Sequence, residues 1–339
     1  MRPAKVVVTN RIHEDVAALL RRTFHVVTNA GCEPFAPDAL LAHARDADAM
    51  LAFMSDAVDA RFLEACPKLR VIACALKGFD NFDIAACTRR GVLVTYVDDL
   101  LTAPTAELAI GLMIALARNI LPGDAHVRSG AFRGWRAHLF GGSIDGATVG
   151  ILGMGAVGKA IAHRLAGFRC RVLYDDANRV LPEHEDVLRA TRRPRPELLA
   201  ESDFVVTVMP LTAETRHVID AAALARMKPG AYLINPGRGS LVDESAVADA
   251  LEAGHLAGYA ADVFEMEDWA RPDRPAVVHP RLLALRDKTV LTPHLGSAVA
   301  RVRREIEREA AQSIIDFFAH GAARKAVNPE VLDQLARRR

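Results

Sequence analysis

The chain has 339 residues, of which 51% are hydrophobic and 25% charged, so it can form two ordinary domains and its composition excludes a disordered chain. A formal net charge of +1 gives no overall field to attract nucleic acid or a membrane surface, so any preference for anions must come from local cations. The five cysteines form no CxxC pair and no spacing typical of a disulfide framework or a zinc site, so no metal is expected.

The start of the chain, "MRPAKVVVTN", contains an apolar run of only three residues, where a signal peptide needs a much longer one. No apolar stretch is expected to reach the length of a membrane span. These two features predict a cytoplasmic protein.

Short apolar runs alternate with amphipathic helical patterns over residues 1–100. Strands are predicted at 5–9, 25–29, 49–54, 69–75 and 92–97. Helices are predicted at 13–22, 37–46, 59–67 and 81–91. This alternation is typical of a parallel sheet covered on both faces, so these residues are predicted to form a doubly wound α/β unit.

The next segment, 101–119, is predicted to be one long apolar helix, buried as a connector between domains, with Pro104 in its first turn. A second series of strands and helices begins at residue 148. Its later apolar segments are 204–210, 231–236, 258–264 and 289–294. This series predicts a second doubly wound domain. A final helix is expected at 297–321, with Ser297 as its N-cap and Gly321 at its end.

The glycines Gly153, Gly155 and Gly158 have the spacing GxGxxG between a predicted strand and a predicted helix. Glycine is needed there for a tight turn, for close approach of the backbone to a pyrophosphate, and for packing of the helix on the strand. The alternative is that these glycines serve only helix–sheet packing. The context of strand, turn and helix favours a dinucleotide site.

An acidic pair, Asp175 and Asp176, ends the next predicted strand about twenty residues further on. Either carboxylate could bind the ribose hydroxyls and would repel a 2′-phosphate, which favours NAD over NADP. Arg179 weakens this preference, because it could assist a phosphate if the loop folds back; the alternative for Arg179 is a solvated loop residue.

Three clusters follow predicted strands of the second domain, where ligands bind in open α/β sheets. They are "NPGRGSLVDE" with Arg238, "DVFEMEDW" with Asp262 and Glu267, and "TPHLGS" with His294. A histidine with a carboxylate partner can act as a general base, and an arginine offers a planar fork for an oxyanion. Each cluster alone has a purely structural explanation, but their shared edge favours a catalytic site.

These motifs, in this order and over nearly the whole chain, resemble those of the NAD-dependent D-2-hydroxyacid dehydrogenases. The resemblance implies a Rossmann-type cofactor domain, 101–296, inserted into a flavodoxin-like substrate domain formed by 1–100 plus 297–339. It implies Arg238, Glu267 and His294 as the catalytic set. The cofactor residues that it implies are Thr105, Gly153, Gly155, Ala156, Val157, Gly158, Asp176, Met209, Pro210, Pro236, Gly237, Arg238, Asp262, His294 and Gly296.

One residue departs from the pattern of 2-hydroxyacid enzymes. Lys77 stands in "LKGFDN", where those enzymes usually carry a small or apolar residue, and this stretch, with "EMEDWA", resembles the phosphite-oxidising members of the family. Phosphite near neutral pH is largely a dianion, which a second cation beside Arg238 would complement. One charge pair in contact is worth about 4 kcal/mol before desolvation. The alternative is that Lys77 reaches solvent or makes a surface pair.

The resemblance therefore predicts oxidation of phosphite to phosphate with NAD as hydride acceptor. Lys77 would join the catalytic set. Phosphite would lie between Arg238 and Lys77, while His294, oriented by Glu267, removes a proton from the attacking water. The substrate-binding residues that it implies are Lys77, Gly78, Met54, Trp135, Arg238 and Ser297.

Two other functions remain open on the same residues. The first is reduction of glyoxylate, hydroxypyruvate or another 2-oxo acid by the same catalytic set. The second is a non-catalytic protein of the same fold that senses dinucleotides. The loop that contains Trp135 usually belongs to a dimer contact in this family, which predicts a homodimer, and no nucleic-acid or membrane partner is expected.

Overall fold

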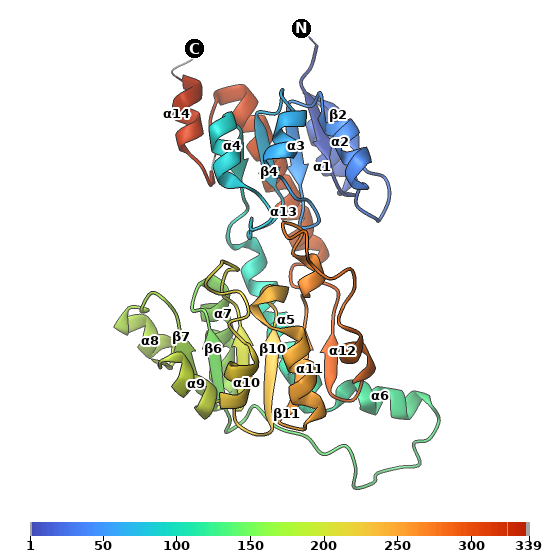
Figure 1. Ribbon diagram of the computed structural model, residues 1–339, viewed down its shortest axis with the longest axis vertical. Helices are drawn as coiled ribbons and strands as arrows, with labels where there is room; N and C mark the ends of the chain where they lie inside the picture. Colours follow the sequence, from blue (N-terminus) through green and yellow to red (C-terminus); the bar gives the residue numbers. More distant parts are fainter. Residues whose placement is uncertain (1, 324, 337–339) are drawn as a thin grey trace. The chain divides into compact units, whose positions relative to one another are not determined.

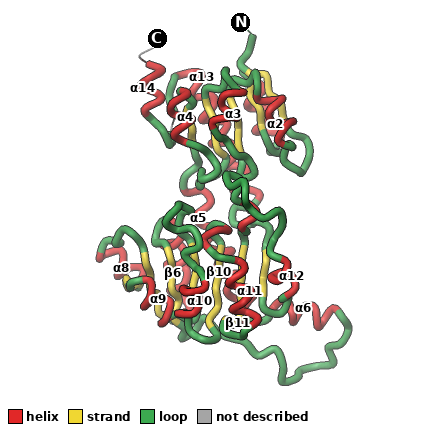
Figure 2. The backbone as a smooth tube through the Cα atoms, in the orientation of Figure 1, coloured by secondary structure: helices red, strands yellow, loops and turns green. Residues whose placement is uncertain are grey.

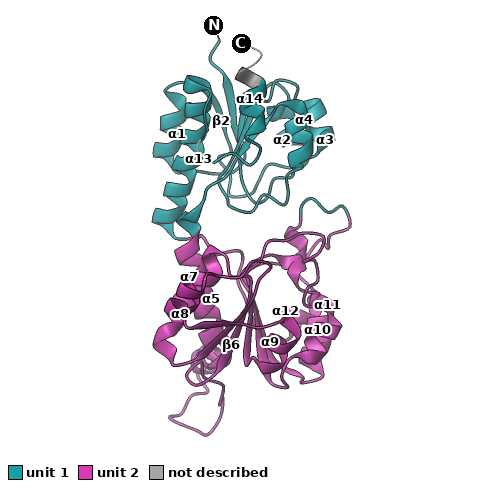
Figure 3. Ribbon diagram, turned by 90° about the vertical axis from the view of Figure 1, so that its left-hand side faces the viewer, with its two compact units in different colours: residues 1–101, 269–272, 299–339 teal, residues 102–268, 273–298 magenta. Residues whose placement is uncertain are grey.

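The computed structural model describes residues 2–323 and 325–336. Its contacts divide the chain into two compact units, coloured separately in Figure 3. Unit 1 comprises Met1–Leu101, Trp269–Pro272 and Val299–Arg339, and unit 2 comprises Thr102–Asp268 and Asp273–Ala298. The sequence predicted that the first part of unit 1 ends at residue 100, one residue before Leu101. It predicted that the last part begins at residue 297, two residues before Val299. The segment Trp269–Pro272, called the strap below, is an additional part of unit 1 that the sequence did not predict.

Unit 1 is built on a five-stranded sheet whose paired strands are all parallel (Figure 1). Its strands are β1 (Lys5–Val8), β2 (His25–Thr28), β3 (Ala49–Ala52), β4 (Val71–Cys74) and β5 (Leu93–Thr95). Its helices are α1 (Glu14–Arg21), α2 (Pro37–Ala44), α3 (Ala60–Ala65), α4 (Ile84–Arg90), η1 (Asp99–Leu101), α13 (Ala300–His320) and α14 (Glu330–Ala336). The strand order β2-β1-β3-β4-β5 confirms the predicted flavodoxin-like unit.

Two hydrophobic clusters cover the two faces of this sheet. Figure 2 shows helices beside the strands of unit 1. One cluster joins the sheet to α1 and α13, and the other joins it to α2, α3 and α4. The expected start of the last helix was wrong, because Val299 and not Ser297 is its N-cap. Its expected end was right: Gly321 has a φ of 65°, a conformation that glycine adopts without strain.

The strap contributes to a cavity of about 560 Å³ in unit 1. Trp269 and Ala270 line this cavity together with Leu41, Phe62 and Phe82. Apolar side chains of helices α2 and α3 thus share the cavity wall with the indole of the strap.

Unit 2 is built on a seven-stranded sheet, also with parallel pairing throughout. Its strands are β6 (Thr148–Leu152), β7 (Arg171–Asp175), β8 (Ala190–Arg192), β9 (Phe204–Thr207), β10 (Ala231–Asn235), β11 (Leu256–Ala261) and β12 (Thr289–Leu291). Its helices are α5 (Thr102–Ala117), α6 (Ile120–Arg128), α7 (Ala156–Leu165), η2 (Ala166–Phe168), α8 (Pro182–Leu188), α9 (Arg195–Glu201), α10 (Ala221–Arg226), η3 (Gly239–Leu241), α11 (Glu244–Glu252), η4 (Glu265–Glu267) and α12 (Pro280–Ala284). The order β12-β11-β10-β9-β6-β7-β8 confirms the predicted Rossmann-type sheet.

Helix α5 lies in the core of unit 2, packed against α7, β10 and β11. The segment Asp99–Ala117 is long and apolar enough to cross a membrane by length and composition alone, with a mean hydropathy of 1.8, so the expectation that no segment would reach this length was wrong. Its apolar character has a second explanation in the structure, because nine residues of α5 are buried. The predicted helix also ends early: Asn119, with a φ of 52°, separates α5 from α6.

Candidate active site

The glycine turn lies between β6 and α7, as predicted. Gly153 has a φ of 100°, and a methyl group added to it would lie 2.8 Å from the backbone nitrogen of Met209. A methyl group on Gly158 would lie 2.1 Å from the carbonyl oxygen of Gly153, so this position packs the helix on the turn. Gly155 faces open space, with no atom within 4 Å of such a methyl group, and it precedes Ala156 at the amino end of α7. These features fit a pyrophosphate bound to the helix N-terminus.

The structure distinguishes the two candidate ribose acids. The carboxylate of Asp176 accepts a hydrogen bond from the backbone N–H of Met154 in the glycine turn, at 2.6 Å. Asp175 belongs to strand β7 and contributes its carbonyl oxygen to the backbone N–H of Gly153. Asp176 is therefore the carboxylate next to the cofactor turn. Arg179 is paired with Glu185 at 3.1 Å, which holds it in an ion pair of its own.

Asp262, at the end of β11, organises the loop that follows β12. Its carboxylate accepts hydrogen bonds from the Thr292 hydroxyl at 2.6 Å and from the backbone N–H groups of Leu295 and Gly296 at 2.7 and 2.8 Å. Burial raises the pKa of the Asp262 carboxyl, and these three hydrogen bonds oppose that effect. A methyl group on Gly296 would lie 3.2 Å from the hydroxyl of Thr105, so three predicted cofactor residues meet here.

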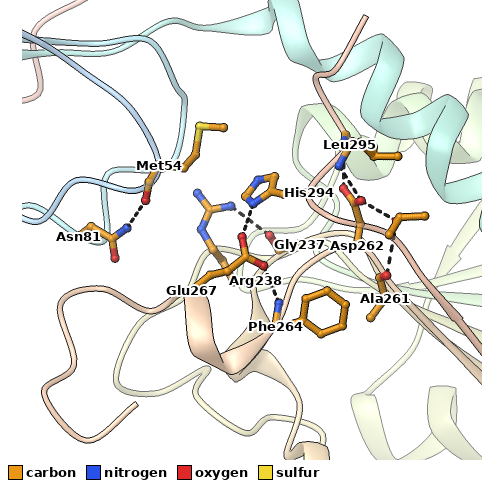
Figure 4. A network of polar contacts seen from close by, with 12 residues as sticks. Met54, Asn81, Gly237, Arg238, Ala261, Asp262, Phe264, Glu267, His294 and Leu295 are labelled. Carbon is orange, nitrogen blue, oxygen red and sulfur yellow. Dashed lines mark hydrogen bonds and ion pairs between the residues drawn. The ribbon is translucent and has the colours of Figure 1, made fainter. Parts of the chain in front are cut away.

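His294 and Glu267 form a direct pair (Figure 4). The histidine Nδ1 lies 2.6 Å from Oε2 of Glu267, whose other oxygen accepts the backbone N–H of Phe264 at 2.8 Å. His294 has a φ of 56°, and its backbone N–H donates to the carbonyl oxygen of Asp262 at 2.8 Å. An ionised carboxylate only accepts hydrogen bonds, so Nδ1–H donates and Nε2 remains to take or give a proton. This arrangement has the parts of a general acid–base catalyst.

Arg238 lies in the turn between β10 and η3. The side-chain amide of Asn235 donates to the carbonyl oxygen of Arg238 at 2.8 Å, which fixes the backbone of the turn. One guanidinium N–H of Arg238 donates to the carbonyl oxygen of Gly237 at 3.0 Å. Figure 4 shows Arg238 beside Glu267 and His294, so three of the four predicted catalytic residues are brought together within unit 2, while Lys77 belongs to unit 1.

Three further predicted substrate residues belong to unit 1, near the carboxyl ends of β3 and β4. The Lys77 ammonium lies 3.4 Å from Asp98 and 3.2 Å from Asp99, and about a third of its side chain is exposed. Met54 follows β3, and its carbonyl oxygen accepts the side-chain amide of Asn81 at 2.9 Å. Gly78 follows Lys77 directly. The Asn81 side chain thereby holds the turn at the end of β3.

Arg303 is a second cation close to these strand ends, and none of the sequence motifs includes it. Its guanidinium lies over the ring of Phe53, 5.5 Å from the centroid, and donates to the carbonyl oxygen of Ala75 at 3.4 Å. Burial lowers the pKa of the Arg303 guanidinium, and the charge of Glu307 opposes this shift. Position 303 lies one helical turn before the buried Glu307 on α13. Charged residues on an otherwise apolar helix stripe were the signal that the sequence offered.

The remaining predicted residues have different surroundings. Ser297 is 9% exposed, in the loop before α13. Met209 and Pro210 follow β9, and Met209 lies beside the glycine turn. Trp135 is 79% exposed, in the loop after α6, and this loop projects from unit 2 in Figure 1. Its place in the substrate site therefore stays a prediction.

The described part of the chain contains no group of three or more histidine, cysteine or acidic residues that could hold a metal ion. The cofactor site instead combines a glycine turn, a helix N-terminus, a ribose acid and the buried Asp262. Together these residues fit NAD.

Comparisons with known proteins agree with this geometry. The family model for the "D-isomer specific 2-hydroxyacid dehydrogenase, NAD binding domain" matches residues 110–296. A glyoxylate reductase of Thermococcus onnurineus is 39% identical, over 98% of this chain and 98% of the relative.

Two solved structures are also similar. A glyoxylate reductase from Paecilomyes thermophila has a TM-score of 0.83 at 26% identity, covering 97% of this chain and 100% of that one. The NADPH-dependent glyoxylate/hydroxypyruvate reductase of Sinorhizobium meliloti, solved with NADP and malonate, has a TM-score of 0.81 at 27% identity, covering 96% and 97%. The family model confirms NAD as the expected cofactor. On its sequence, its two parallel sheets and its Arg238, Glu267 and His294 cluster, the chain belongs to the D-isomer specific 2-hydroxyacid dehydrogenase family.

Proposed function

We propose that this oxidoreductase oxidises phosphite to phosphate with NAD. The observation that carries the proposal is the position of two cations, Lys77 and Arg303, at the end of β4, in addition to Arg238. Lys77 is also paired with Asp98 and Asp99, and a bound dianion would compete with these carboxylates for it. A 2-hydroxy acid presents one carboxylate, which one arginine can bind through its planar fork. A dianion gains from further positive charge, and the desolvated guanidinium of Arg303 would regain favourable interaction from a bound anion.

The proposal assigns Arg238 and Lys77 to the phosphite oxygens. His294 takes a proton at Nε2 from the water that attacks phosphorus, and Glu267 stabilises the resulting imidazolium through Nδ1–H. The water oxygen becomes the fourth oxygen of phosphate as the P–H bond breaks. Bound NAD supplies the acceptor for that hydride. Asp176 would bind the ribose, and the amino end of α7 would bind the pyrophosphate.

Reduction of a small 2-oxo acid such as glyoxylate is the second candidate. The names of several curated relatives favour it over phosphite oxidation, since these relatives are glyoxylate reductases. In that reaction Arg238 would bind the carboxylate, and protonated His294 would give its Nε2 proton to the carbonyl oxygen. Lys77 is not needed for a monoanion, and it is the residue on which the two candidates differ.

One set of assays separates the candidates. Purified protein is given NAD with phosphite, D-lactate or D-glycerate, and NADH with glyoxylate or hydroxypyruvate, while NADH absorbance is followed. The proposal requires phosphite to have the highest kcat/KM. A higher value for glyoxylate would establish the second candidate, and NAD binding without any turnover would indicate a dinucleotide sensor.

The Lys77→Ala variant tests whether the Lys77 ammonium contributes to binding of the phosphite dianion. A unit charge pair is worth about 4 kcal/mol at contact. Partial exposure and the neighbouring Asp98 and Asp99 reduce this value, so we expect kcat/KM for phosphite to fall about tenfold or more, with the KM for NAD unchanged. Lys325→Ala is the matched control, because Lys325 also pairs with Asp98, at 2.8 Å. If Lys77→Ala and Lys325→Ala lower kcat/KM for phosphite equally, Lys77 does not belong to the proposed substrate site.

Two further expectations belong to the same proposal, namely a homodimer and a cytoplasmic location. The homodimer is supported by exposed apolar side chains on α6 and the loop after it. They are Ile120, Leu121, Val127, Phe132, Trp135, Leu139 and Phe140. Sedimentation of the wild type against Trp135→Ser/Phe140→Ser tests it, with dissociation of the variant as the expected result.

A further inference from the structure

Two turns of unit 2 carry the proposed chemistry, and they are in direct backbone contact. Arg238 precedes η3, and Glu267 ends η4. A methyl group added to Gly239 would lie 1.9 Å from the carbonyl carbon of Phe264 and 2.3 Å from the backbone nitrogen of Glu265. Gly239 therefore permits an approach that no other residue would allow.

A buried hydrogen bond joins the same two turns. The hydroxyl of Ser240, two residues after Arg238, donates to the carboxylate of Asp268, which follows Glu267 directly. Ser240 is 0% and Asp268 4% exposed. A buried carboxylate with a hydrogen-bond donor is costly to disrupt, so this bond holds its two turns in register.

Other polar contacts hold the outer side of η4. Glu244, at the start of α11, accepts the backbone N–H of Glu265 at 2.9 Å, while the carboxylate of Glu265 accepts the backbone N–H of Glu244 at 3.2 Å. The backbone N–H of His217 donates to the carbonyl oxygen of Ser240 at 2.7 Å. These contacts fix each turn to its neighbours. Ser240 lies two residues after Arg238, and Asp268 directly follows Glu267, so their hydrogen bond joins the two turns next to the reactive side chains.

We propose that Ser240 and Asp268 are positioning residues that set Arg238 relative to the Glu267–His294 pair. Neither residue touches the reacting atoms; each acts through the backbone of its turn. A displacement of about 1 Å between substrate-binding and acid–base groups is enough to lower a rate about a hundredfold. The inference rests on the proposed chemistry of Arg238, Glu267 and His294, with either phosphite or a 2-oxo acid as substrate.

The test uses Ser240→Ala, Asp268→Ala and the double variant, assayed on whichever substrate the wild type turns over best. We expect each single variant to lower kcat at least tenfold with the KM for NAD within twofold of wild type, and the double variant to be no slower than the slower single one. Asp268→Asn keeps an oxygen that accepts the Ser240 hydroxyl, so it should recover most of the kcat lost in Asp268→Ala. Unchanged kcat in Ser240→Ala, or multiplied losses in the double variant, would overturn the proposal.

Two controls separate a loss of positioning from a general effect of removing a buried hydroxyl. Ser202→Ala removes another fully buried hydroxyl of unit 2, which donates to the carbonyl oxygen of Leu198 at 2.6 Å, and it should leave kcat within twofold. Hydrogen exchange of the backbone amides of Glu267 and Asp268 needs no substrate. Faster exchange in Ser240→Ala than in Ser202→Ala is expected even if the proposed function fails, and equal exchange would count against the positioning role.

Discussion

Replacing Glu267 by glutamine tests the acid–base pair directly. The substitution keeps an oxygen to accept the backbone N–H of Phe264 and removes the charge that faces His294. The two side chains are 27% and 25% exposed, so solvent screens part of their interaction. A charge pair worth about 4 kcal/mol at an effective dielectric near 20 is then reduced to about 2 kcal/mol. This predicts a loss in kcat of about 30-fold.

The measurement is kcat at saturating NAD with the preferred substrate, together with the KM for NAD. Glu252→Gln is the matched control, because it removes a carboxylate that pairs with Arg281 elsewhere in unit 2, at 2.5 Å. The control should change kcat less than twofold. A loss below threefold in Glu267→Gln would show that the carboxylate does not stabilise the imidazolium in the rate-limiting step.

Two further predictions concern single carboxylates. Burial raises the pKa of Asp56 to about 6 against hydrogen bonds from Thr9 and Phe53. The folded chain therefore holds more protons than the unfolded chain between about pH 4 and 6, and its free energy of unfolding falls as pH rises through that window. Asp56→Asn should flatten this part of the plot of Tm against pH, and an unchanged slope would contradict the assignment. Asp176→Ala should raise the KM for NAD about tenfold and reduce the ratio of kcat/KM for NAD to kcat/KM for NADP. Asp175→Ala should change this ratio less. Equal effects of the two variants would show that Asp176 is not the ribose acid.

The sequence was sufficient for the sheets because each apolar run has the length and composition of a strand buried on both faces. It was also sufficient for the pairing of His294 with Glu267, since β11 and β12 are neighbours and their carboxyl ends meet at one edge. The short strand β8 (Ala190–Arg192) was missed, because two of its three residues are exposed and carry no apolar pattern.

Other features depended on tertiary contacts that local patterns do not encode. Arg303 is one of several arginines on an amphipathic helix, and its place on the apolar stripe does not by itself reveal its contacts with Phe53 and Ala75. Trp135 was expected near the substrate from resemblance alone, and its exposure was not visible in the sequence. The strap has no helix or strand periodicity, so its membership of unit 1 follows only from contacts made in the fold.

The strap also limits how modular this enzyme can be. Besides the boundaries after Leu101 and Ala298, the chain changes unit on each side of Trp269–Pro272. A transplanted or separately expressed segment 102–298 would carry Trp269 without Phe62 and Phe82, which line the same cavity from unit 1. In a chimera that combines the cofactor unit of one family member with the substrate unit of another, residues 269–272 should therefore come from the same parent as the substrate unit. The outer boundaries after Leu101 and Ala298 need the same care. Without it, recombination would separate Trp269 from the side chains of unit 1 that line this cavity with it.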